Sequence, residues 1–383
     1  MADSDAQPKK AMPALDPNSM QDGKLHPGEI FWRDNQPWLQ EKGYALRKRY
    51  HPDWVPSWFK SPKKPWIECE DGIITRIGHI IDATRPDGSH VVLKRVDTSR
   101  HPDEVAIGRL FSSEALASHP SNHCIPILDV LPLPNDDNTV ILVMPLLYPN
   151  ELPPFETIGE VVEFCRQAFE GLQFIHKNHV AHRDCKYDNI MADTAALYIS
   201  PPHPWEMWLT YDASRQTQQL YSRTQKPVKY YFIDFGLSRL YKPEDAPYLE
   251  EGVWGGDKTV PEFLNAEDIP HSDPFPVDVY CLGNAIRQSF VDGEEGISTA
   301  KRGLEFMKEL IYDMVKEDPK ARPTMDQVVT RFSNIIGGLS NWKLRSRLVD
   351  VDERPVRGIL RSVVHWTKQF GIIATRIPAI PRA

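Results

Sequence analysis

The stretch that most constrains this chain is residues 180–189, which read Val-Ala-His-Arg-Asp-Cys-Lys-Tyr-Asp-Asn. An amphipathic segment precedes this stretch and an apolar tripeptide follows it. Polar groups crowded onto a loop between two structured segments are typical of a site where chemistry is performed on a rigid scaffold. The groups that can hydrogen-bond or titrate are His182, Arg183, Asp184, Lys186 and Asn189.

Composition limits the class of protein. With 383 residues the chain is long enough for two packed lobes with extensions, and its net charge of −8 argues against nucleic-acid binding as its main function. The five cysteines form no C-x-x-C pair, so we expect neither a zinc site nor a disulfide framework. The opening residues lack the pattern of a signal peptide, and no run of 18 apolar residues occurs. We therefore expect an intracellular protein, cytoplasmic or nuclear, without a transmembrane segment.

Periodicity predicts the main elements on either side of the loop. Residues 158–177 carry apolar side chains at alternating spacings of four and three, which predicts a helix with one core-facing stripe. Residues 73–81 and 90–96 are rich in β-branched side chains and are separated by a Pro-Asp-Gly turn, which predicts two strands. A second helix is predicted at residues 103–111, with acids in its first turn.

Lys94 has an unusual place in the second of these strands. Alternation puts it on the same face as Val92 and Val96. A lysine between two valines is costly to bury without an anion, which favours a phosphate ligand. An edge strand that leaves Lys94 in water is the alternative, and the strand alone does not decide between the two.

Four further motifs stand in a fixed order along the chain. Asp-Phe-Gly occupies residues 234–236, Val-Pro-Glu occupies 260–262, a helix opens at Asp278, and Asp-Pro-Lys-Ala-Arg-Pro occupies 318–323. With His182-Arg183-Asp184 and Asn189, they resemble the protein kinase superfamily, in a divergent Ser/Thr form that is similar to the kinase-like proteins of fungi. The resemblance implies an α+β, two-lobed fold with a small β-rich N-lobe and a larger, mainly helical C-lobe.

The resemblance also divides the chain. Residues 1–27 would be a flexible arm, 28–65 a Trp-rich extension, 66–147 the N-lobe and 148–337 the C-lobe, followed by a basic tail at 338–383. Within the C-lobe, residues 195–226 are expected to be an insertion, either an irregular surface loop or a partner surface.

The family's motifs assign a role to each matching residue. Lys94 would bind the α- and β-phosphates of ATP, paired with Glu104 or, as a rival, Glu114. Asp184 would accept the proton of the substrate hydroxyl, and Lys186 would neutralise charge on the γ-phosphate. The resemblance implies Mg²⁺ held by Asn189 and Asp234, and adenine or phosphate contacts from Gly78, Val92 and the backbone of Leu147.

The expected function is therefore transfer of the ATP γ-phosphate to Ser or Thr hydroxyls of a protein substrate. Ile73 and Thr75 stand where the family has the first two glycines of its phosphate loop, so a pseudokinase that serves as a binding scaffold is an alternative. Lys186 and the Val-Pro-Glu motif distinguish the chain from small-molecule kinases, which are the third reading.

Two regions outside the motifs carry predictions of their own. The tryptophans of residues 28–66 need a cover, so we expect them to dock on the domain that follows rather than to form a separate partner module. The tail from residue 341 carries nine Lys and Arg against three Asp and Glu. It predicts either docking on the acidic remainder of the chain or a basic amphipathic helix that contacts an anionic membrane.

Arg183 also carries a regulatory prediction. In the family this arginine pairs with a phosphate on the activation segment, here residues 234–262, in which Gly255 replaces the usual threonine. We expect an acid of the pairs Glu244-Asp245 or Glu250-Glu251 to substitute for that phosphate.

Overall fold

The computed structural model describes residues 21–60, 64–252, 256–264 and 271–382. Most of the predicted N-terminal arm and Gly255 lie outside these residues. The chain divides into two compact units. Unit 1 comprises the described residues through Asp97, together with Ile127–Leu146 and Ser200–Thr217, and unit 2 comprises the remainder.

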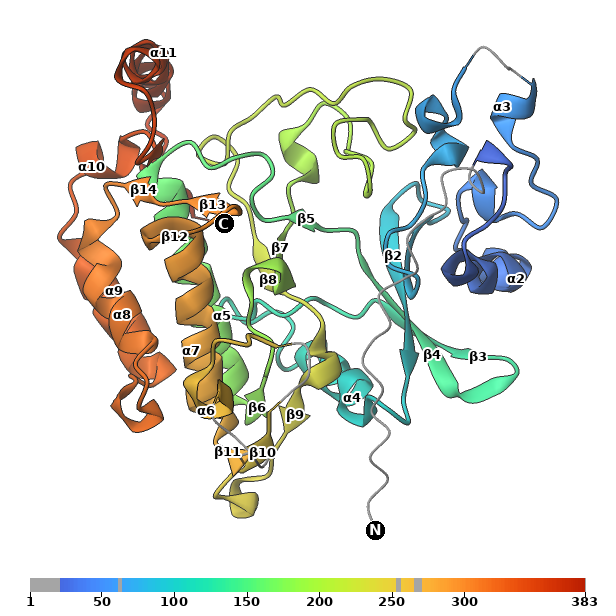
Figure 1. Cartoon of the computed structure of the whole chain (residues 1–383), viewed down its shortest axis with the longest axis horizontal. Helices are drawn as coiled ribbons and strands as arrows, with labels where there is room; N and C mark the ends of the chain where they lie inside the picture. The colour runs from blue at the N-terminus through green and yellow to red at the C-terminus, as the bar shows by residue number, and fades with distance from the viewer. Residues whose placement is uncertain (1–20, 61–63, 253–255, 265–270, 383) are drawn as a thin grey trace. The chain divides into compact units, whose positions relative to one another are not determined.

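A four-stranded antiparallel sheet forms the centre of unit 1 (Figure 1). Its strands are β1 (Ile80–Thr84), β2 (His90–Asp97), β4 (Asp136–Pro145) and β3 (Asp129–Leu133), in that spatial order. In β2 the side chains of Val91 and Leu93 enter the core on one face of the sheet, which places Lys94 on the other face. Lys94 lies opposite Ile80 on one side and Leu142 on the other.

The Trp-rich extension packs on this sheet, as predicted. Helix α2 (Pro27–Glu41) begins with a capping box between His26 and Glu29 and buries Trp32 and Leu39 in the same core as Val91 and Leu93. Pro37 lies inside α2, although a proline there removes one backbone hydrogen bond of the helix. The lost backbone bond is outweighed there by burial of the apolar face.

The strand predicted at residues 73–81 forms only in its last two residues. The chain before them runs through two 3-10 turns, η2 (Trp66–Glu68) and η3 (Glu70–Gly72), and joins no sheet before Ile80. Side chains from the extension satisfy its carbonyl groups instead. Arg47 donates to the carbonyl of Ile73 at 2.8 Å, and the Trp32 indole donates to that of Gly78 at 3.1 Å.

Part of the insertion folds into unit 1. Residues 200–217 are largely irregular, but they surround the buried carboxylate of Asp82 on β1. Asp82 accepts hydrogen bonds from the Tyr211 hydroxyl (2.9 Å) and the Trp205 indole (3.2 Å), and it pairs with Arg47 (3.2 Å). This stretch is therefore a packed part of the unit rather than the irregular surface loop we expected.

Acid is expected to destabilise unit 1 through His203, an insertion residue with no exposed surface. Burial lowers its pKa from 6.5 to about 4. The contribution of the neutral ring is therefore complete above pH 6.5 and is lost as the pH falls toward 4. By pH 5 the loss should reach about 2 kcal/mol. Denaturant unfolding at pH 7.5 and pH 5, followed by tryptophan fluorescence, measures it.

A His203→Gln variant should lose that part of the pH dependence. The control is His271→Gln, because this histidine of unit 2 is more than half exposed. Equal pH dependence in the two variants would contradict the role of His203.

Unit 2 is mainly helical. Helix α5 (Ile158–Lys177) has the predicted bounds and buries the whole predicted stripe, and a capping box between Thr157 and Glu160 starts it. It packs against α9 (Met325–Gly337), which begins with a capping box at Thr324. The other longer helices are α4 (Pro102–Phe111), α7 (Pro274–Ile286), α8 (Lys308–Met314) and α11 (Pro355–Ala374).

Short elements connect these helices. The strands are β5 (Tyr148–Pro149), β6 (Val180–Ala181), β7 (Ile190–Ala192), β8 (Tyr230–Phe232), β9 (Arg239–Leu240), β10 (Glu250–Glu251), β11 (His271–Ser272), β12 (Gly293–Glu294), β13 (Ser298–Thr299), β14 (Lys301–Arg302) and β15 (Val349–Asp350). The short helices of unit 2 are α6 (Pro261–Leu264) and α10 (Asn341–Arg345), and the short helix α3 (Ser57–Lys60) belongs to unit 1. Among the described helices, none is both long and apolar enough to cross a bilayer.

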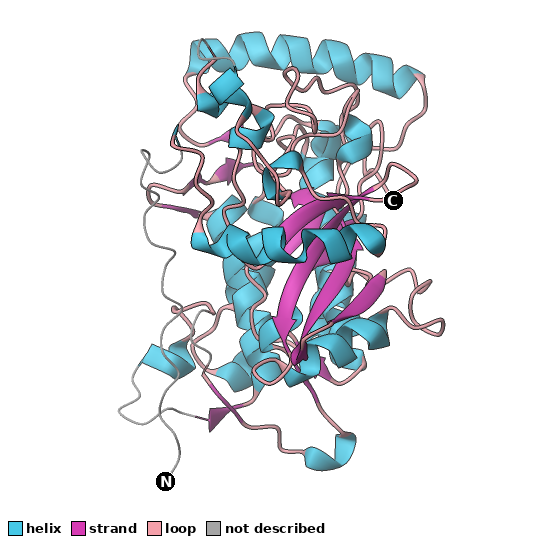
Figure 2. Cartoon of the chain, turned by 90° about the vertical axis from the view of Figure 1, so that its right-hand side faces the viewer, coloured by secondary structure: helices cyan, strands magenta, loops and turns pink. Residues whose placement is uncertain are grey.

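The tail docks on unit 2. Strand β15 pairs with β14, and α10 packs on α5. Figure 2 shows α11 as a long, straight helix along the top edge of the view. Docking was one of the two outcomes predicted for the tail. The other outcome, contact of an amphipathic helix with an anionic membrane, depends on which face α11 exposes.

Candidate active site

The loop that contains Asp184 is held by α7. The carboxylate of Asp278, which has no exposed surface, accepts hydrogen bonds from the backbone N–H groups of His182 and Arg183, each at 2.7 Å. The ring of His176 on α5 lies 3.0 Å from the same carboxylate. These contacts hold Arg183 in a left-handed conformation (φ 66°), which a non-glycine residue adopts only when its surroundings enforce it.

Asp184 is buried and its two carboxylate oxygens differ. Oδ2 accepts a hydrogen bond from Nδ2 of Asn189 at 2.8 Å and lies 3.1 Å from Nζ of Lys186. Oδ1 is also buried, and no described residue donates a hydrogen bond to it. A buried acceptor without a partner costs free energy unless a ligand completes it. Oδ1 of Asp184 is therefore an acceptor position that suits a substrate hydroxyl.

Asp234 and Glu104 converge on Gly236. Asp234 adopts a left-handed conformation (φ 62°) that turns the chain into the 3-10 helix η6 (Phe235–Leu237). A methyl group on Gly236 would lie 3.2 Å from Oδ1 of Asp234 and 3.2 Å from Oε2 of Glu104. Glu104 is a buried residue of α4, whereas its rival Glu114 is exposed and lies beyond the end of that helix.

The residues in this region fit a magnesium ion. Nδ2 of Asn189 donates to Asp184, so the amide oxygen of Asn189 remains as an acceptor. Mg²⁺ prefers one or two protein oxygens together with phosphate oxygens over a complete protein cage. The described residues contain no cluster of three or more His, Cys, Asp or Glu side chains that could hold a metal ion. Asn189 and Asp234 offer the oxygen donors that such an ion needs.

The remaining predicted site residues are divided between the units. Leu147 is buried in unit 2, while Gly78, Val92 and Lys94 belong to unit 1. Lys94 is 7% exposed and Val92 is partly buried. Gly78 packs against α2, since a methyl group on it would lie 3.1 Å from Cα of Gly28.

Arg183 contacts the activation segment. Its guanidinium lies 3.3 Å from Oε2 of Glu250 and donates to the carbonyl oxygens of Glu251 (2.7 Å) and Leu237 (3.3 Å). Of the two acidic pairs proposed from the sequence, the second therefore faces this arginine. Burial is the main cause that raises the pKa of the neighbouring Tyr241 hydroxyl, with Glu250 adding to it.

The cysteine beside Asp184 is inert in the folded chain. Cys185 has no exposed surface, and burial raises the pKa of its thiol well above the ordinary value. The nucleophilic form of cysteine is the thiolate, so a raised pKa and burial both oppose reaction.

Two supporting contacts complete the region, and one of them was missed from the sequence. Arg322 forms a bidentate pair with Glu262 at 2.6 and 2.7 Å, as the family motifs imply. The missed residue is His101, whose Nδ1 lies 2.6 Å from the carbonyl oxygen of Gly236. Only its position just before α4 could have indicated it, because the contact joins residues 135 positions apart.

Packing explains the two aromatic motif residues. The ring of Phe235 lies 5.0 Å from that of His182 and 5.8 Å from that of Phe111 on α4, measured between centroids. His182 has no exposed surface. Within unit 2 these rings connect α4 to the Asp184 loop through apolar contact, which agrees with a packing role rather than a chemical one.

Parts of this chain are similar in sequence to known proteins. "Myosin light chain kinase 3" of Rattus norvegicus is 28% identical over 125 residues, which are 32% of this chain and 11% of that protein. The "Putative serine/threonine-protein kinase/receptor R831" of Acanthamoeba polyphaga mimivirus is 22% identical over 215 residues, which are 50% of this chain and 11% of that protein. The chain thus spans only a small part of the length of these relatives.

The family model described as "Protein kinase domain" matches residues 76–332, well over half of the chain. The match covers the sheet of unit 1 and the helical core of unit 2, in accord with the predicted α+β fold class. This chain belongs to the protein kinase family.

Proposed function

We propose that this chain is an active protein kinase that transfers the γ-phosphate of ATP to serine or threonine hydroxyls of a protein substrate. The observation that carries the proposal is the buried Oδ1 of Asp184, to which no described residue donates a hydrogen bond. A substrate hydroxyl within hydrogen-bond distance of it would be aligned for transfer as its proton passes to the carboxylate.

The other residues supply alignment and positive charge, which phosphoryl transfer needs most. Lys186, whose ammonium lies 3.1 Å from Oδ2 of Asp184, would neutralise charge that develops on the γ-phosphate. Lys94, with Glu104 as its acid, would orient the α- and β-phosphates. Asn189 and Asp234 would hold Mg²⁺, which adds positive charge to the phosphates when it is bound.

The preference for Ser and Thr rests on weaker support than the kinase activity. Lys186 stands at the position where Ser/Thr kinases have a lysine and tyrosine kinases usually have another residue. The printed name of the mimivirus relative includes serine/threonine-protein kinase, at 22% identity.

A binding scaffold without catalysis is the second candidate. The observation that favours it is the segment before β1, where a phosphate loop is expected. Its glycine, Gly78, packs against α2 and accepts a hydrogen bond from Trp32, so its backbone is engaged elsewhere. Retention of Asp184, Asn189 and Asp234 together favours the enzyme, because a scaffold needs none of them.

Nucleotide binding separates the two candidates. For an enzyme, Mg-ATP at 100 times its dissociation constant should stabilise the native chain by about 2.7 kcal/mol and raise the unfolding midpoint by several degrees. An Asp234→Ala variant should lose most of that rise. An unchanged midpoint in the wild-type protein, together with no transfer of labelled phosphate to protein, would establish the scaffold.

Activity is expected without phosphorylation of the activation segment, because Glu250 occupies the place of a phosphate beside Arg183. Phosphatase treatment should therefore leave transfer unchanged. Glu250→Gln should lower it about tenfold, since hydrogen bonds to charged groups contribute about 1.5 kcal/mol or more. Glu244→Gln is the matched control, because Glu244 is an exposed acid of the same segment. Loss of activity on phosphatase treatment would contradict the prediction.

A further inference from the structure

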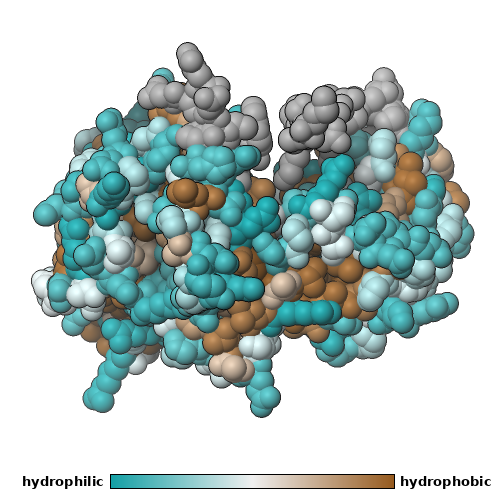
Figure 3. All heavy atoms as spheres, turned by 90° about the horizontal axis from the view of Figure 1, so that it is seen from below, coloured by the Kyte–Doolittle hydropathy of each residue, from teal (hydrophilic) through white to brown (hydrophobic). Residues whose placement is uncertain are grey.

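Helix α11 turns its apolar face away from unit 2. The side that packs inward presents His365, Gln369 and Ile372, of which the first two are polar. The outward side chains are apolar and more than half exposed: Val356 (75%), Ile359 (66%), Leu360 (67%), Val363 (62%), Val364 (71%) and Phe370 (57%). A surface helix of a globular protein normally has the opposite orientation. By contrast, hydrophilic residues cover most of the face drawn in Figure 3.

Directed contacts accompany this orientation. The His365 ring lies 2.8 Å from the carbonyl oxygen of Arg345, and Lys368 forms an ion pair with Glu156 at 2.6 Å. Arg361 pairs with Glu353 at 3.0 Å near the start of the helix. Rotating α11 to bury its apolar face would break these contacts. The exposed apolar face therefore belongs to the docked state of the helix.

Cations follow one edge of the apolar face. On a period of 3.6 residues, Arg357, Arg361 and Lys368 fall on one side of the helix, next to Leu360 and Val364. Among the described residues Arg357 has no acidic partner, and the tail as a whole carries a large excess of Lys and Arg. Since Arg361 and Lys368 are already paired with Glu353 and Glu156, Arg357 is the cation of this edge that an anionic surface would complement, whereas a second copy of the helix would bring a face with the same cation.

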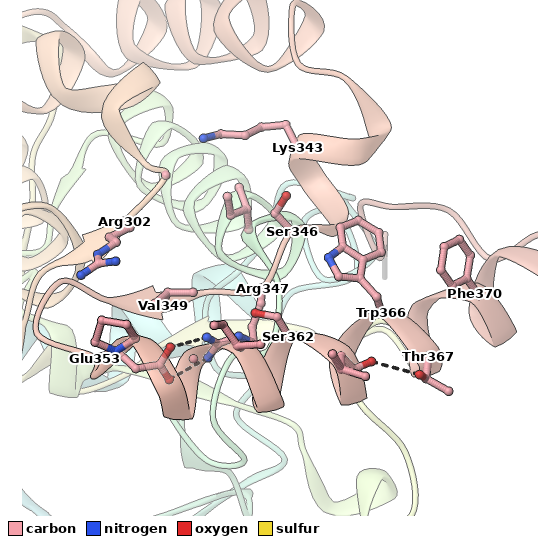
Figure 4. Close-up of a pocket in the computed structure, with 16 residues that line it drawn as sticks. Arg302, Lys343, Ser346, Arg347, Val349, Glu353, Ser362, Trp366, Thr367 and Phe370 are labelled. Atoms are coloured by element: carbon pink, nitrogen blue, oxygen red, sulfur yellow. Dashed lines mark hydrogen bonds and ion pairs between the residues drawn. The ribbon is translucent and has the colours of Figure 1, made fainter.

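A groove runs along the other edge of the face. It has a volume of about 810 Å³ and lies between α11 and the segment that carries Lys343 and Ser346 (Figure 4). Trp366 and Phe370 line it, and the Trp342 ring, whose residue is 60% exposed, lies 5.3 Å from that of Trp366. Tryptophan side chains favour the boundary between water and lipid.

We propose that α11 lies in the headgroup region of an anionic phospholipid bilayer, with its apolar face toward the acyl chains. Leu360, Val363 and Val364 would enter the boundary between headgroups and acyl chains, and Arg357 would contact lipid phosphates. Such a helix binds through buried apolar area together with attraction between cations and anionic lipids. This surface is separate from the Asp184 site, so the proposal does not depend on catalysis.

Flotation of the full chain with vesicles tests the proposal. Vesicles of phosphatidylcholine and phosphatidylserine in a ratio of about seven to three should bind the protein at least tenfold more tightly than pure phosphatidylcholine. Binding should weaken as salt is raised. Equal binding to neutral and anionic vesicles, or no binding to either, would overturn the proposal.

Two variants separate the contributions of the face and its edge. Leu360→Asp should lower binding to anionic vesicles at least tenfold, and Arg357→Gln about fivefold, the effect of one cation near the surface. The control is Ile67→Asp, because Ile67 of unit 1 is as exposed as Leu360 (66% against 67%) and should leave binding unchanged.

Light scattering tests whether a second copy of the chain, rather than lipid, covers the apolar face of α11. The proposal expects the same mass for the wild-type protein and for Leu360→Asp in the absence of lipid. A wild-type dimer that Leu360→Asp converts to a monomer, with vesicle binding unaffected, would assign the face to self-association and overturn the lipid proposal.

Discussion

Replacing Asp184 with asparagine is expected to lower phosphoryl transfer about 10²- to 10⁴-fold, the range for removal of a positioned acid or base. The amide can still meet Asn189 and Lys186, which contact Oδ2 of the carboxylate. It cannot accept a proton at the position of Oδ1, which has no partner among the described residues. The loss should therefore appear in turnover, whereas the thermal shift with Mg-ATP should remain.

The matched control for this variant is Asp188→Asn in the same loop. Asp188 is exposed and lies in η4 (Tyr187–Asn189), one position before Asn189. Its activity should stay close to that of the wild type, because it makes no contact with the Asp184 carboxylate. If Asp184→Asn retains full transfer activity, Asp184 is not the base. If the variant also unfolds at a lower temperature than the wild type, the carboxylate contributes to folding. Turnover must then be compared below the unfolding midpoint of the variant.

Local patterns predicted the parts of unit 2 that hold the site. The apolar stripe of α5 repeats over neighbouring residues, so periodicity was sufficient to predict this helix. The Asp184 loop was found because its polar residues are adjacent in sequence. The role of Asp278 followed only from the resemblance, since its contacts reach back 95 and 96 residues.

The segment before β1 could not be predicted in this way. Ile73 and Thr75 are β-branched and favour a strand when they are considered alone. Helix α2 packs against that segment. The backbones of Gly28 and Gly78 approach so closely that a methyl group on Gly28 would lie 2.9 Å from Cα of Gly78. Because this contact joins residues 50 positions apart, no local sequence pattern indicates it. Tertiary packing therefore overrides the strand preference of this segment.

The orientation of α11 also could not be predicted from periodicity. The sequence pattern correctly predicted an amphipathic helix in the tail. Which face packs inward depended on single polar contacts, such as that between His365 and the carbonyl of Arg345. A hydrophobic stripe normally marks the buried face, and here that rule gives the wrong side.

Replacing Arg49 with methionine is expected to destabilise unit 1 by about 3–5 kcal/mol, the range for breaking a buried ion pair by removing one partner. Arg49 and Glu29 have no exposed side-chain surface and are joined by two contacts, at 2.7 and 2.9 Å. The Arg49 guanidinium also donates to the carbonyl of Asp71 at 3.1 Å. The variant would leave the Glu29 carboxylate buried, with the Tyr50 hydroxyl and the His26 N–H as its remaining donors.

The size of this effect measures how far the Trp-rich extension is part of the folded unit, because Glu29 lies on α2 and Asp71 lies just before the sheet. Denaturant unfolding followed by tryptophan fluorescence gives the free energy. Arg33→Met is the matched control on α2, the helix that carries Glu29, since the ion pair of Arg33 with Asp34 is exposed and should contribute less than about 1 kcal/mol. Adding Glu29→Leu to Arg49→Met should recover much of the loss, because no buried charge then remains unpaired. If Arg49→Met unfolds at the same denaturant concentration as Arg33→Met, the extension is not coupled to the sheet through this pair.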